Sequence, residues 1–143
     1  MSNNTGTTKI IEKKPINILL VEDNPVDEKY IQELLKEVKF NFNLQIVNNL
    51  ASAIDLLKKD DIDIILLDFN LPDSRGLETF NAIVLIAGSK PIVIITELKD
   101  EYLIEYTLKK GAQEYIMKSK LSSEYLSNVI LYCIEKSQLQ HDL

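Results

Sequence analysis

The chain has few of the residues that stabilise secreted folds or carry a protein through a membrane. Cys133 is the single cysteine among 143 residues, so an intramolecular disulfide is excluded. No apolar stretch approaches the roughly 20 residues that a membrane-spanning helix needs, and the N-terminal residues lack the apolar core of a signal peptide. We therefore expect a reduced, cytoplasmic setting without membrane association.

Positive charge is also in the minority. The chain has 16 basic and 22 acidic residues, which gives a net charge of -6. This balance argues against a general attraction to nucleic acid or to anionic membranes. With 143 residues and 45% hydrophobic content, the chain is long enough for one buried core and too short for a second domain.

Apolar runs of strand length alternate with segments of helical periodicity after Pro15. The runs cover residues 16–21, 44–47, 62–67, 92–96 and 114–118, and the helical segments carry apolar residues within 30–38, 50–57, 80–87, 102–108 and 126–133. This alternation predicts an α/β fold, a doubly wound five-stranded parallel sheet with helices on both faces. The flavodoxin-like strand order 2-1-3-4-5 fits it best.

The two ends of the chain differ from this predicted core. Residues 1–14 are rich in Asn, Thr and Lys and are predicted to form a flexible tail. We expect the domain to span residues 15–137. Residues 138–143 would then form a C-terminal tail or the start of a linker.

Four of the apolar runs stop at polar residues of different kinds. Glu22 and Asp23 follow the first run, Asp68 follows the third, Thr96 ends the fourth and Lys118 ends the fifth. Because the carboxyl ends of parallel strands meet at one edge of a sheet, we expect these side chains to gather in one crevice. Two carboxylates there would repel each other by about 4 kcal/mol at roughly 4 Å and an effective dielectric near 20. Mg²⁺, which prefers oxygen ligands, and the Lys118 ammonium would compensate that charge.

The same crevice suits the chemistry of a phosphoryl group. An aspartate can act as a nucleophile toward phosphorus, while the Lys118 ammonium and the Thr96 hydroxyl suit the phosphoryl oxygens. Taken singly, Asp23 could cap the first helix before Pro25, and Thr96 and Lys118 would be an ordinary strand residue and a solvated one. Only their combination indicates a site for a divalent cation and a phosphoryl group.

Four segments resemble the receiver domain of bacterial and archaeal two-component response regulators. They are Leu-Val-Glu22-Asp23-Asn-Pro, Leu-Leu-Asp68-Phe-Asn-Leu-Pro-Asp, Ile-Ile-Thr96 and Gly-Ala-Gln-Glu-Tyr115-Ile-Met-Lys118. The resemblance covers about residues 15–137. It implies that Asp68 accepts a phosphoryl group from a histidine kinase or phosphotransfer protein. It also implies that Mg²⁺ is held by Glu22, Asp23, Asp68 and the backbone carbonyl of Asn70.

The resemblance further implies a switch. Thr96 and Lys118 would bind the phosphoryl oxygens, and Thr96 and Tyr115 would change the face formed by the helix at 102–108, the strand at 114–118 and the last helix. That face would bind a downstream protein target or a fused module, and it could pair two copies into a homodimer. Tyr115 as a plain core or surface aromatic is an equally good interpretation. The domain would be a phosphoacceptor rather than an enzyme, with at most slow self-dephosphorylation.

Three residues depart from the commonest receiver pattern. Glu97 follows Thr96 where a small residue is usual, and we expect it to change the rate of phosphorylation or dephosphorylation. Ser119 follows Lys118 where proline is usual, so the sequence leaves the isomer of that peptide bond open. Glu22 stands where aspartate is common and adds one methylene between the backbone and the ion.

Three other functions share parts of this pattern. A magnesium-dependent aspartyl-phosphate phosphatase would begin with the same chemistry, but the haloacid-dehalogenase-like class has a second aspartate two residues after the nucleophile, where this chain has Asn70. An FMN carrier would share the fold, but Glu22 and Asp23 would repel the flavin phosphate. A receiver-like interaction module that is not regulated by phosphorylation is the third. The intact set of acids, Thr96 and Lys118 argues against it, and Glu97 favours it.

Overall fold

The computed structural model describes residues 14–142, with side chains described as far as residue 139. The tail predicted for residues 1–14 therefore lies almost entirely outside the described residues. The described chain forms a parallel sheet in the order β2-β1-β3-β4-β5. Its elements are β1 (Ile16–Val21), α2 (Pro25–Leu35), β2 (Phe42–Val47), α3 (Leu50–Lys59), β3 (Ile64–Leu67), α4 (Leu77–Ala87), β4 (Ile92–Thr96), α5 (Glu101–Lys109), β5 (Glu114–Met117), η1 (Lys118–Lys120) and α6 (Ser123–Asp142).

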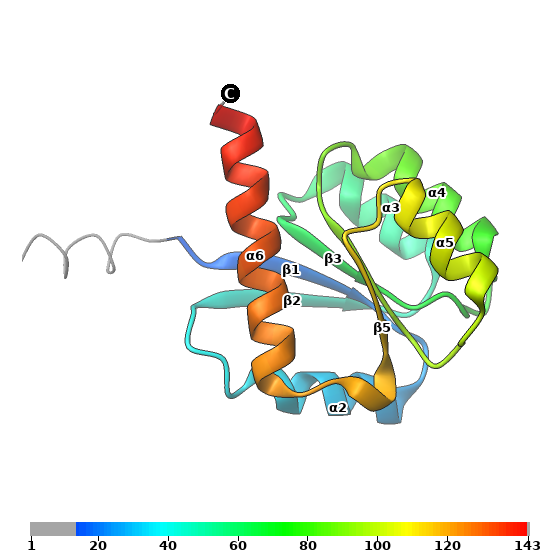
Figure 1. The fold of residues 1–143 in the computed structure, drawn as a ribbon, viewed down its shortest axis with the longest axis horizontal. Coiled ribbons are helices and arrows are strands. Elements are labelled where there is room, and N and C mark those ends of the chain that lie inside the picture. The colour runs from blue at the N-terminus through cyan, green and yellow to red at the C-terminus, as the bar shows by residue number, and fades with distance from the viewer. Residues whose placement is uncertain (1–13, 143) are drawn as a thin grey trace, which may run out of the picture.

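The sheet lies as a middle layer between two groups of helices (Figure 1). Helices α3, α4 and α5 cover one face, and α2 and α6 cover the other. Successive side chains of β1 alternate between the two cores, with Leu19 in the first and Leu20 in the second. Every residue of β3 is buried, as a central strand covered on both sides requires. The predicted fold class and strand order are confirmed.

Side-chain caps start helices α2, α3 and α5 shortly after the strand ends at the carboxyl edge. The Asn24 side-chain oxygen accepts hydrogen bonds from the N–H groups of Val26, at 2.8 Å, and Asp27, at 3.1 Å. Pro25 occupies the first turn of α2, where its missing N–H would have no partner within the helix. Asp100 caps α5 in the same way. The chain therefore turns sharply at this edge and leaves the last strand residues facing a common space.

Several predicted boundaries differ from the observed ones. β2 begins at Phe42 rather than at residue 44, and β3 begins at Ile64 rather than at residue 62. β5 ends at Met117, so Lys118 opens the short helix η1 instead of closing the strand. Helix α6 continues to Asp142, so residues 138–142 extend that helix and the predicted boundary at residue 137 does not coincide with the end of an element.

The helical periodicity within residues 30–38 predicts that Tyr30 is buried, but it is exposed. Tyr30 is 43% exposed, because it lies at the margin of the buried stripe of α2, where its hydroxyl donates to the backbone carbonyl of Leu121 at 3.2 Å. In α3, Ala51 is exposed while Ala53 and Leu57 are buried. An amphipathic helix buries only one stripe of side chains. The spacing of apolar residues alone did not identify correctly which residues belong to that stripe.

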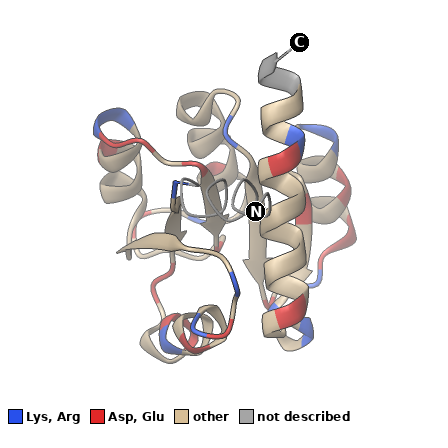
Figure 2. Cartoon of the chain, turned by 90° about the vertical axis from the view of Figure 1, so that its left-hand side faces the viewer, with Lys and Arg blue, Asp and Glu red and all other residues tan. Residues whose placement is uncertain are grey.

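The charged residues do not form a single-sign surface on the side shown in Figure 2, where acidic and basic positions are interspersed over helices and turns. Across residues 14–142, no helix has the length and apolar character needed to cross a membrane.

Candidate functional site

The strand register brings the predicted polar residues to one level of the sheet. Val21 of β1 pairs with Leu67 of β3, so the residues that follow them, Glu22 and Asp68, leave neighbouring strands side by side. Thr96, the last residue of β4, pairs with Met117 of β5. Lys118 comes immediately after that pair. The carboxyl edge of the sheet therefore collects all of these side chains, as predicted.

These residues line a cleft of about 440 Å³. Every site residue predicted near the phosphoacceptor contributes to its wall, and so do residues that the sequence did not single out for the site. The lining consists of Glu22, Asp23, Asn24, Asp27, Asp68, Asn70, Thr96, Glu97, Leu98 and Lys118. Tyr115 is not among them. Half of these residues are acidic, and Lys118 is the basic one.

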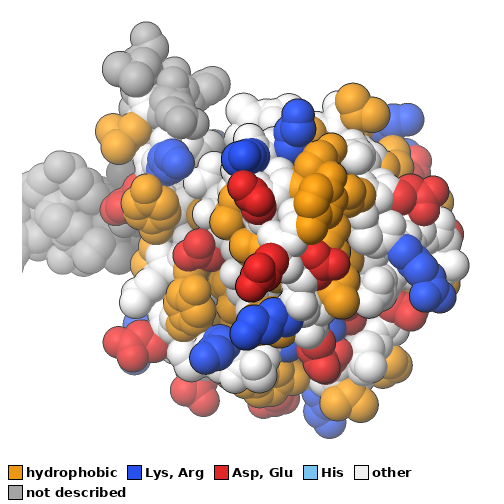
Figure 3. Space-filling view, turned by 45° about the vertical axis from the view of Figure 1, so that its right-hand side comes forward, with side chains coloured by type: hydrophobic (Ala, Val, Ile, Leu, Met, Phe, Trp, Pro, Cys, Tyr) orange, Lys and Arg blue, Asp and Glu red, His pale blue; other side chains and the backbone are white. Residues whose placement is uncertain are grey.

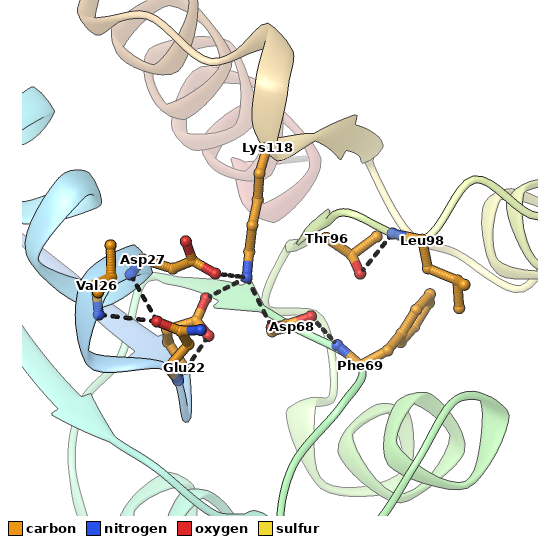
Figure 4. Close-up of polar contacts among 9 residues, drawn as sticks. Glu22, Val26, Asp27, Asp68, Phe69, Thr96, Leu98 and Lys118 are labelled. Carbon is orange, nitrogen blue, oxygen red and sulfur yellow. Dashed lines mark hydrogen bonds and ion pairs between the residues drawn. The ribbon is translucent and has the colours of Figure 1, made fainter.

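Lys118 is the centre of the polar contacts in this cleft (Figure 4). Its Nζ lies 2.6 Å from Asp27 Oδ2, 2.9 Å from Asp68 Oδ2 and 3.0 Å from Glu22 Oε1. The side chain is buried, and burial alone would lower its pKa. The hydrogen bonds to Asp27 and Asp68 and the close contact with the Glu22 carboxylate outweigh burial and raise the pKa of Lys118 above its ordinary value. Lys118 is therefore a cation over the physiological pH range.

Glu22 is the most deeply buried of the acids, with 1% of its surface exposed. Burial, followed by the nearby negative charge of Asp68, raises its pKa to about 7. Its Oε2 accepts a hydrogen bond from the Asn24 N–H at 3.1 Å. Its Oε1 contacts Lys118 as an ion pair, but within the described residues it accepts no hydrogen bond of good geometry. A buried carboxylate oxygen left in this way has unused capacity for a cation.

Asp68 carries the second buried carboxylate. Its Oδ1 accepts a hydrogen bond from the N–H of Phe69 at 2.7 Å, and its Oδ2 accepts one from Lys118. Asp23 is exposed at the rim. The side chains described by the structure contain no set of three acidic, histidine or cysteine groups that converges as metal ligands. Lys118 Nζ, rather than a third carboxylate, is the group in contact with both Glu22 and Asp68.

The donor set nevertheless fits a hard dication. Carboxylate and carbonyl oxygens are the ligands Mg²⁺ prefers, and one or two protein carboxylates suffice because the ion keeps several waters. Glu22, Asp23 and Asn70 line the same cleft as Asp68. The buried Oε1 of Glu22, which has an ion pair with Lys118 but no hydrogen bond, is the observation in this structure that most directly supports a cation there.

The other side of the cleft connects to Tyr115. Thr96 is buried, and its Oγ1 accepts a hydrogen bond from the Leu98 N–H at 3.3 Å. The Tyr115 hydroxyl donates to the Leu98 carbonyl at 2.6 Å, and its ring centroid lies 5.8 Å from that of Phe69. Burial, reinforced by the charges of Asp100 and Asp68, raises the pKa of Tyr115 to about 12. Tyr115 is thus linked to both loops that flank the acceptor without lining the cleft itself.

The loop after β3 is held by contacts that the sequence did not reveal. Thr79 Oγ1 donates to the Phe69 carbonyl at 2.9 Å and lies 2.6 Å from Ser74 Oγ. Asp73 accepts hydrogen bonds from the N–H groups of Leu50 and Ala51 at the start of α3, and these lower the pKa of Asp73. Together they fix the chain on either side of Asn70.

Asp27 is the other residue that sequence reasoning missed. It was indistinguishable from the acidic residues that commonly stabilise the first turn of a helix. Its position four residues after Asp23 was the available signal, because it places Asp27 in the first turn of the helix that follows Asp23. The peptide bond between Lys118 and Ser119, left open by the sequence, is trans.

The family model of the response regulator receiver domain matches residues 18–130. The chain belongs to the receiver domain family of response regulators. It is 31% identical over 107 residues to the nitrate/nitrite response regulator protein NarP of Escherichia coli (strain K12), covering 75% of this chain and 50% of NarP. It is 32% identical over 111 residues to the chemotaxis protein CheY-3 of Vibrio cholerae, covering 76% of this chain and 84% of CheY-3. The chain thus spans about half the length of NarP but most of the length of CheY-3.

A solved structure adds a comparison for the site. The receiver domain of the sensor histidine kinase PA1611 from Pseudomonas aeruginosa PAO1 superposes with a TM-score of 0.71 and 25% identity, covering 85% of this chain and 99% of that one. That protein has a magnesium ion coordinated in its active site cleft. Receiver domains are the phosphoacceptor signalling domains of two-component systems and work with histidine kinases or phosphotransfer proteins and with downstream effectors. The predicted family and its general role are confirmed.

Proposed function

We propose that Asp68 is the residue of this receiver domain that accepts the phosphoryl group, from a phosphohistidine of a histidine kinase or phosphotransfer protein. The supporting observation is the Asp68 carboxylate itself, buried in the cleft with Oδ2 2.9 Å from the Lys118 ammonium. A carboxylate oxygen of Asp68 attacks phosphorus, and the bond between phosphorus and the imidazole nitrogen breaks with its electron pair left on that nitrogen. The products are an aspartyl phosphate and a histidine that can take a proton from water.

Mg²⁺ would be held by Glu22, Asp23, Asp68 and the backbone carbonyl of Asn70. When bound, it would offset the negative charge of the carboxylates and of the phosphoryl oxygens. The magnesium found in the PA1611 receiver domain and the buried Glu22 Oε1, which accepts no hydrogen bond, support this assignment.

Lys118 and Thr96 would contact the phosphoryl oxygens. The Lys118 ammonium already lies beside the acceptor oxygen of Asp68, so it can remain close to the group that becomes attached there. The Thr96 hydroxyl accepts a hydrogen bond from Leu98, which leaves its own proton available to donate to a phosphoryl oxygen. Movement of Thr96 to make that new bond would lengthen or break its existing contact with the Leu98 N–H.

The output would pass through Leu98 to Tyr115. Leu98 contacts Thr96 through its N–H and Tyr115 through its carbonyl. Movement of Thr96 toward a phosphoryl group would therefore change the hydrogen bond between Leu98 and the Tyr115 hydroxyl. We assign the resulting switch surface to α5, β5 and α6, where it would meet a downstream protein target, a fused module or a second copy of the chain. Figure 3 shows a strip of hydrophobic side chains bordered by acidic and basic ones on one face of the molecule. Tyr102 of α5 is 64% exposed.

The aspartyl phosphate would be lost slowly. Asn70 stands two residues after Asp68 and cannot act as a general base, since an amide does not take up a proton at neutral pH. The domain is therefore proposed to store the phosphoryl group rather than to turn over phosphate esters. Its cytoplasmic location stays a prediction from the sequence.

The test is phosphorylation by phosphoramidate, a small phosphodonor, followed by intact mass. We expect the wild-type chain to gain the mass of one phosphoryl group with Mg²⁺ and none with a chelator, and Asp68→Asn to gain none. Asp55→Asn removes an exposed acid that pairs with Lys59 far from the cleft and serves as the matched control. A wild-type chain that never gains the phosphoryl mass would favour the interaction module that is not regulated by phosphorylation.

A further inference from the structure

Asp27 makes the shortest contact with Lys118, yet the proposed phosphotransfer assigns it no role. It lies in the first turn of α2, where its N–H is bound by the cap Asn24. Its Oδ2 is 2.6 Å from Lys118 Nζ, and the two residues are separated by 91 positions in the chain. Its side chain is 21% exposed and lines the cleft, and Figure 4 shows it pointing from α2 toward Lys118.

The three carboxylate partners of Lys118 differ in what phosphorylation does to them. The Lys118 ammonium donates hydrogen bonds to Asp27 and Asp68 and forms an ion pair with Glu22. Under the proposed function, Asp68 becomes an ester and Glu22 becomes a candidate magnesium ligand. For Asp27, the one side-chain partner among the described residues is Lys118. Its contact with Lys118 can therefore persist while the other two contacts change.

The backbone around Lys118 is anchored to the same helix. The Tyr30 hydroxyl of α2 donates to the Leu121 carbonyl at 3.2 Å, and Ser123 Oγ donates to the Leu34 carbonyl at 2.8 Å. These bonds join α2 to the segment between β5 and α6 and to the start of α6. Helices α2 and α6 lie side by side in Figure 1. The distance between the Asp27 backbone and the Lys118 backbone is consequently held by contacts that do not involve the cleft.

From this geometry we infer that Asp27 is a positioning residue, which keeps the Lys118 ammonium aligned with the acceptor oxygen before and after the phosphoryl group arrives. This inference rests on the proposed function of Asp68. Without Asp27, the flexible Lys118 side chain would lose the one carboxylate partner that phosphorylation leaves unchanged. The fold would remain, because the anchoring bonds of Tyr30 and Ser123 do not depend on Asp27.

The experiment compares Asp27→Asn with Glu28→Gln, using phosphoramidate and saturating Mg²⁺. Both variants remove one negative charge from the first turn of α2, but in the structure Glu28 contacts Gln32 and not Lys118. We expect Asp27→Asn to lower the maximal phosphorylation rate about tenfold, as loss of one charge-assisted hydrogen bond implies. The KM for phosphoramidate and the Mg²⁺ affinity measured by calorimetry should stay within about twofold, because Asp27 is assigned to neither. Glu28→Gln should leave all three values within that range.

Equal maximal rates for wild type and Asp27→Asn would overturn the inference, and so would an equal fall in Glu28→Gln, which would indicate a general charge effect. Failure of the proposed function would look different, because the wild-type chain itself would then not be labelled. A second measurement needs no variant: NMR can detect scalar coupling between Lys118 Nζ and the Asp27 carboxyl carbon. We expect that coupling both in the free chain and in the chain saturated with Mg²⁺ and beryllofluoride, a phosphoryl mimic. Loss of the coupling in the second sample would contradict a contact that persists.

Discussion

Lys118 Nζ lies 2.9 Å from Asp68 Oδ2, although the two residues come from strands that do not pair with each other. Asp68 follows β3 and Lys118 follows β5, with β4 between them, so the lysine side chain reaches across a whole strand. A residue with a shorter side chain at position 118 would not make this contact. The ion pair joins the central strand to the edge strand at the point where the proposed chemistry occurs.

Removing the acceptor charge should make the chain at least as stable while weakening its response to Mg²⁺. In Asp68→Asn, Lys118 keeps Asp27 and Glu22, and the repulsion between Asp68 and Glu22 is lost. At a Mg²⁺ concentration ten times its Kd, the wild type should gain about 1.4 kcal/mol in free energy of unfolding, and Asp68→Asn should gain much less. Urea unfolding with and without Mg²⁺ measures both quantities. An equal Mg²⁺ response in the two proteins would exclude Asp68 as a ligand.

Glu97 should slow phosphorylation by an anionic donor. It is exposed and lines the mouth of the cleft, so its charge repels a phosphodonor that approaches Asp68. We expect Glu97→Ala and Glu97→Gln to raise kcat/KM for phosphoramidate about threefold at low salt, with the difference shrinking as salt screens the charge. A rise in Glu97→Ala alone would assign the effect to bulk. Identical kinetics in both variants and in the wild type would remove Glu97 from the mechanism.

The Tyr115 hydroxyl should stabilise the loop after β4. Tyr115→Phe removes the donor to the Leu98 carbonyl but keeps the ring that packs against Phe69. The free energy of unfolding should fall by about 1 kcal/mol, and backbone amide shifts should change mainly around residues 97–100. Denaturant melts and two-dimensional NMR check this. Unchanged stability together with unchanged shifts at Leu98 would show that the hydrogen bond contributes nothing in solution.

The Cys133 thiol should make the stability of the fold depend on pH, by a mechanism that does not involve the cleft. It is 2% exposed, and burial, reinforced by the charge of Glu114, raises the pKa of its thiol from 9.0 to about 11. The folded chain therefore keeps the thiol proton between pH 9 and 11 while the unfolded chain releases it, so stability should fall as pH rises through that window. The contribution is on the order of 2 kcal/mol.

Cys133→Ala is the comparison for that prediction. Its free energy of unfolding should be lower at neutral pH, because a cavity replaces the sulfur, but it should decline less steeply between pH 9 and 11. The native wild-type thiol should also react slowly with a disulfide reagent at pH 8 and quickly once unfolded. Parallel pH profiles for the two proteins would contradict the raised pKa.

The sequence was sufficient for the fold class and for the residues of the proposed acceptor chemistry, because both depend on local patterns. Strands of a parallel sheet all present their carboxyl ends to one edge, so identifying where each apolar run stops also identifies the residues that reach that edge. Glu22, Asp68 and Lys118 could be grouped for this reason before any contact was known. Asn24 and Pro25 likewise gave the start of α2 through capping rules.

The remaining features depend on helix phase and on long-range contacts. Asp27 is an acidic residue in a first helical turn, and only the packing of α2 against the segment after β5 turns it toward Lys118. The helical spacing predicted that Tyr30 is buried, but its ring lies at the margin of the buried stripe and its hydroxyl donates to the Leu121 carbonyl. The Tyr115 contact is with a backbone carbonyl, which carries no signature in the side-chain sequence. No local rule indicates such partners.

The most direct test of the central claim is to locate the phosphoryl group chemically. After incubation with phosphoramidate and Mg²⁺, borohydride reduction would convert an aspartyl phosphate to homoserine, which peptide sequencing by mass spectrometry can place. The account predicts homoserine at position 68 alone, in the wild type and in Asp55→Asn. Homoserine at position 23 or 27 with Asp68 intact would contradict it.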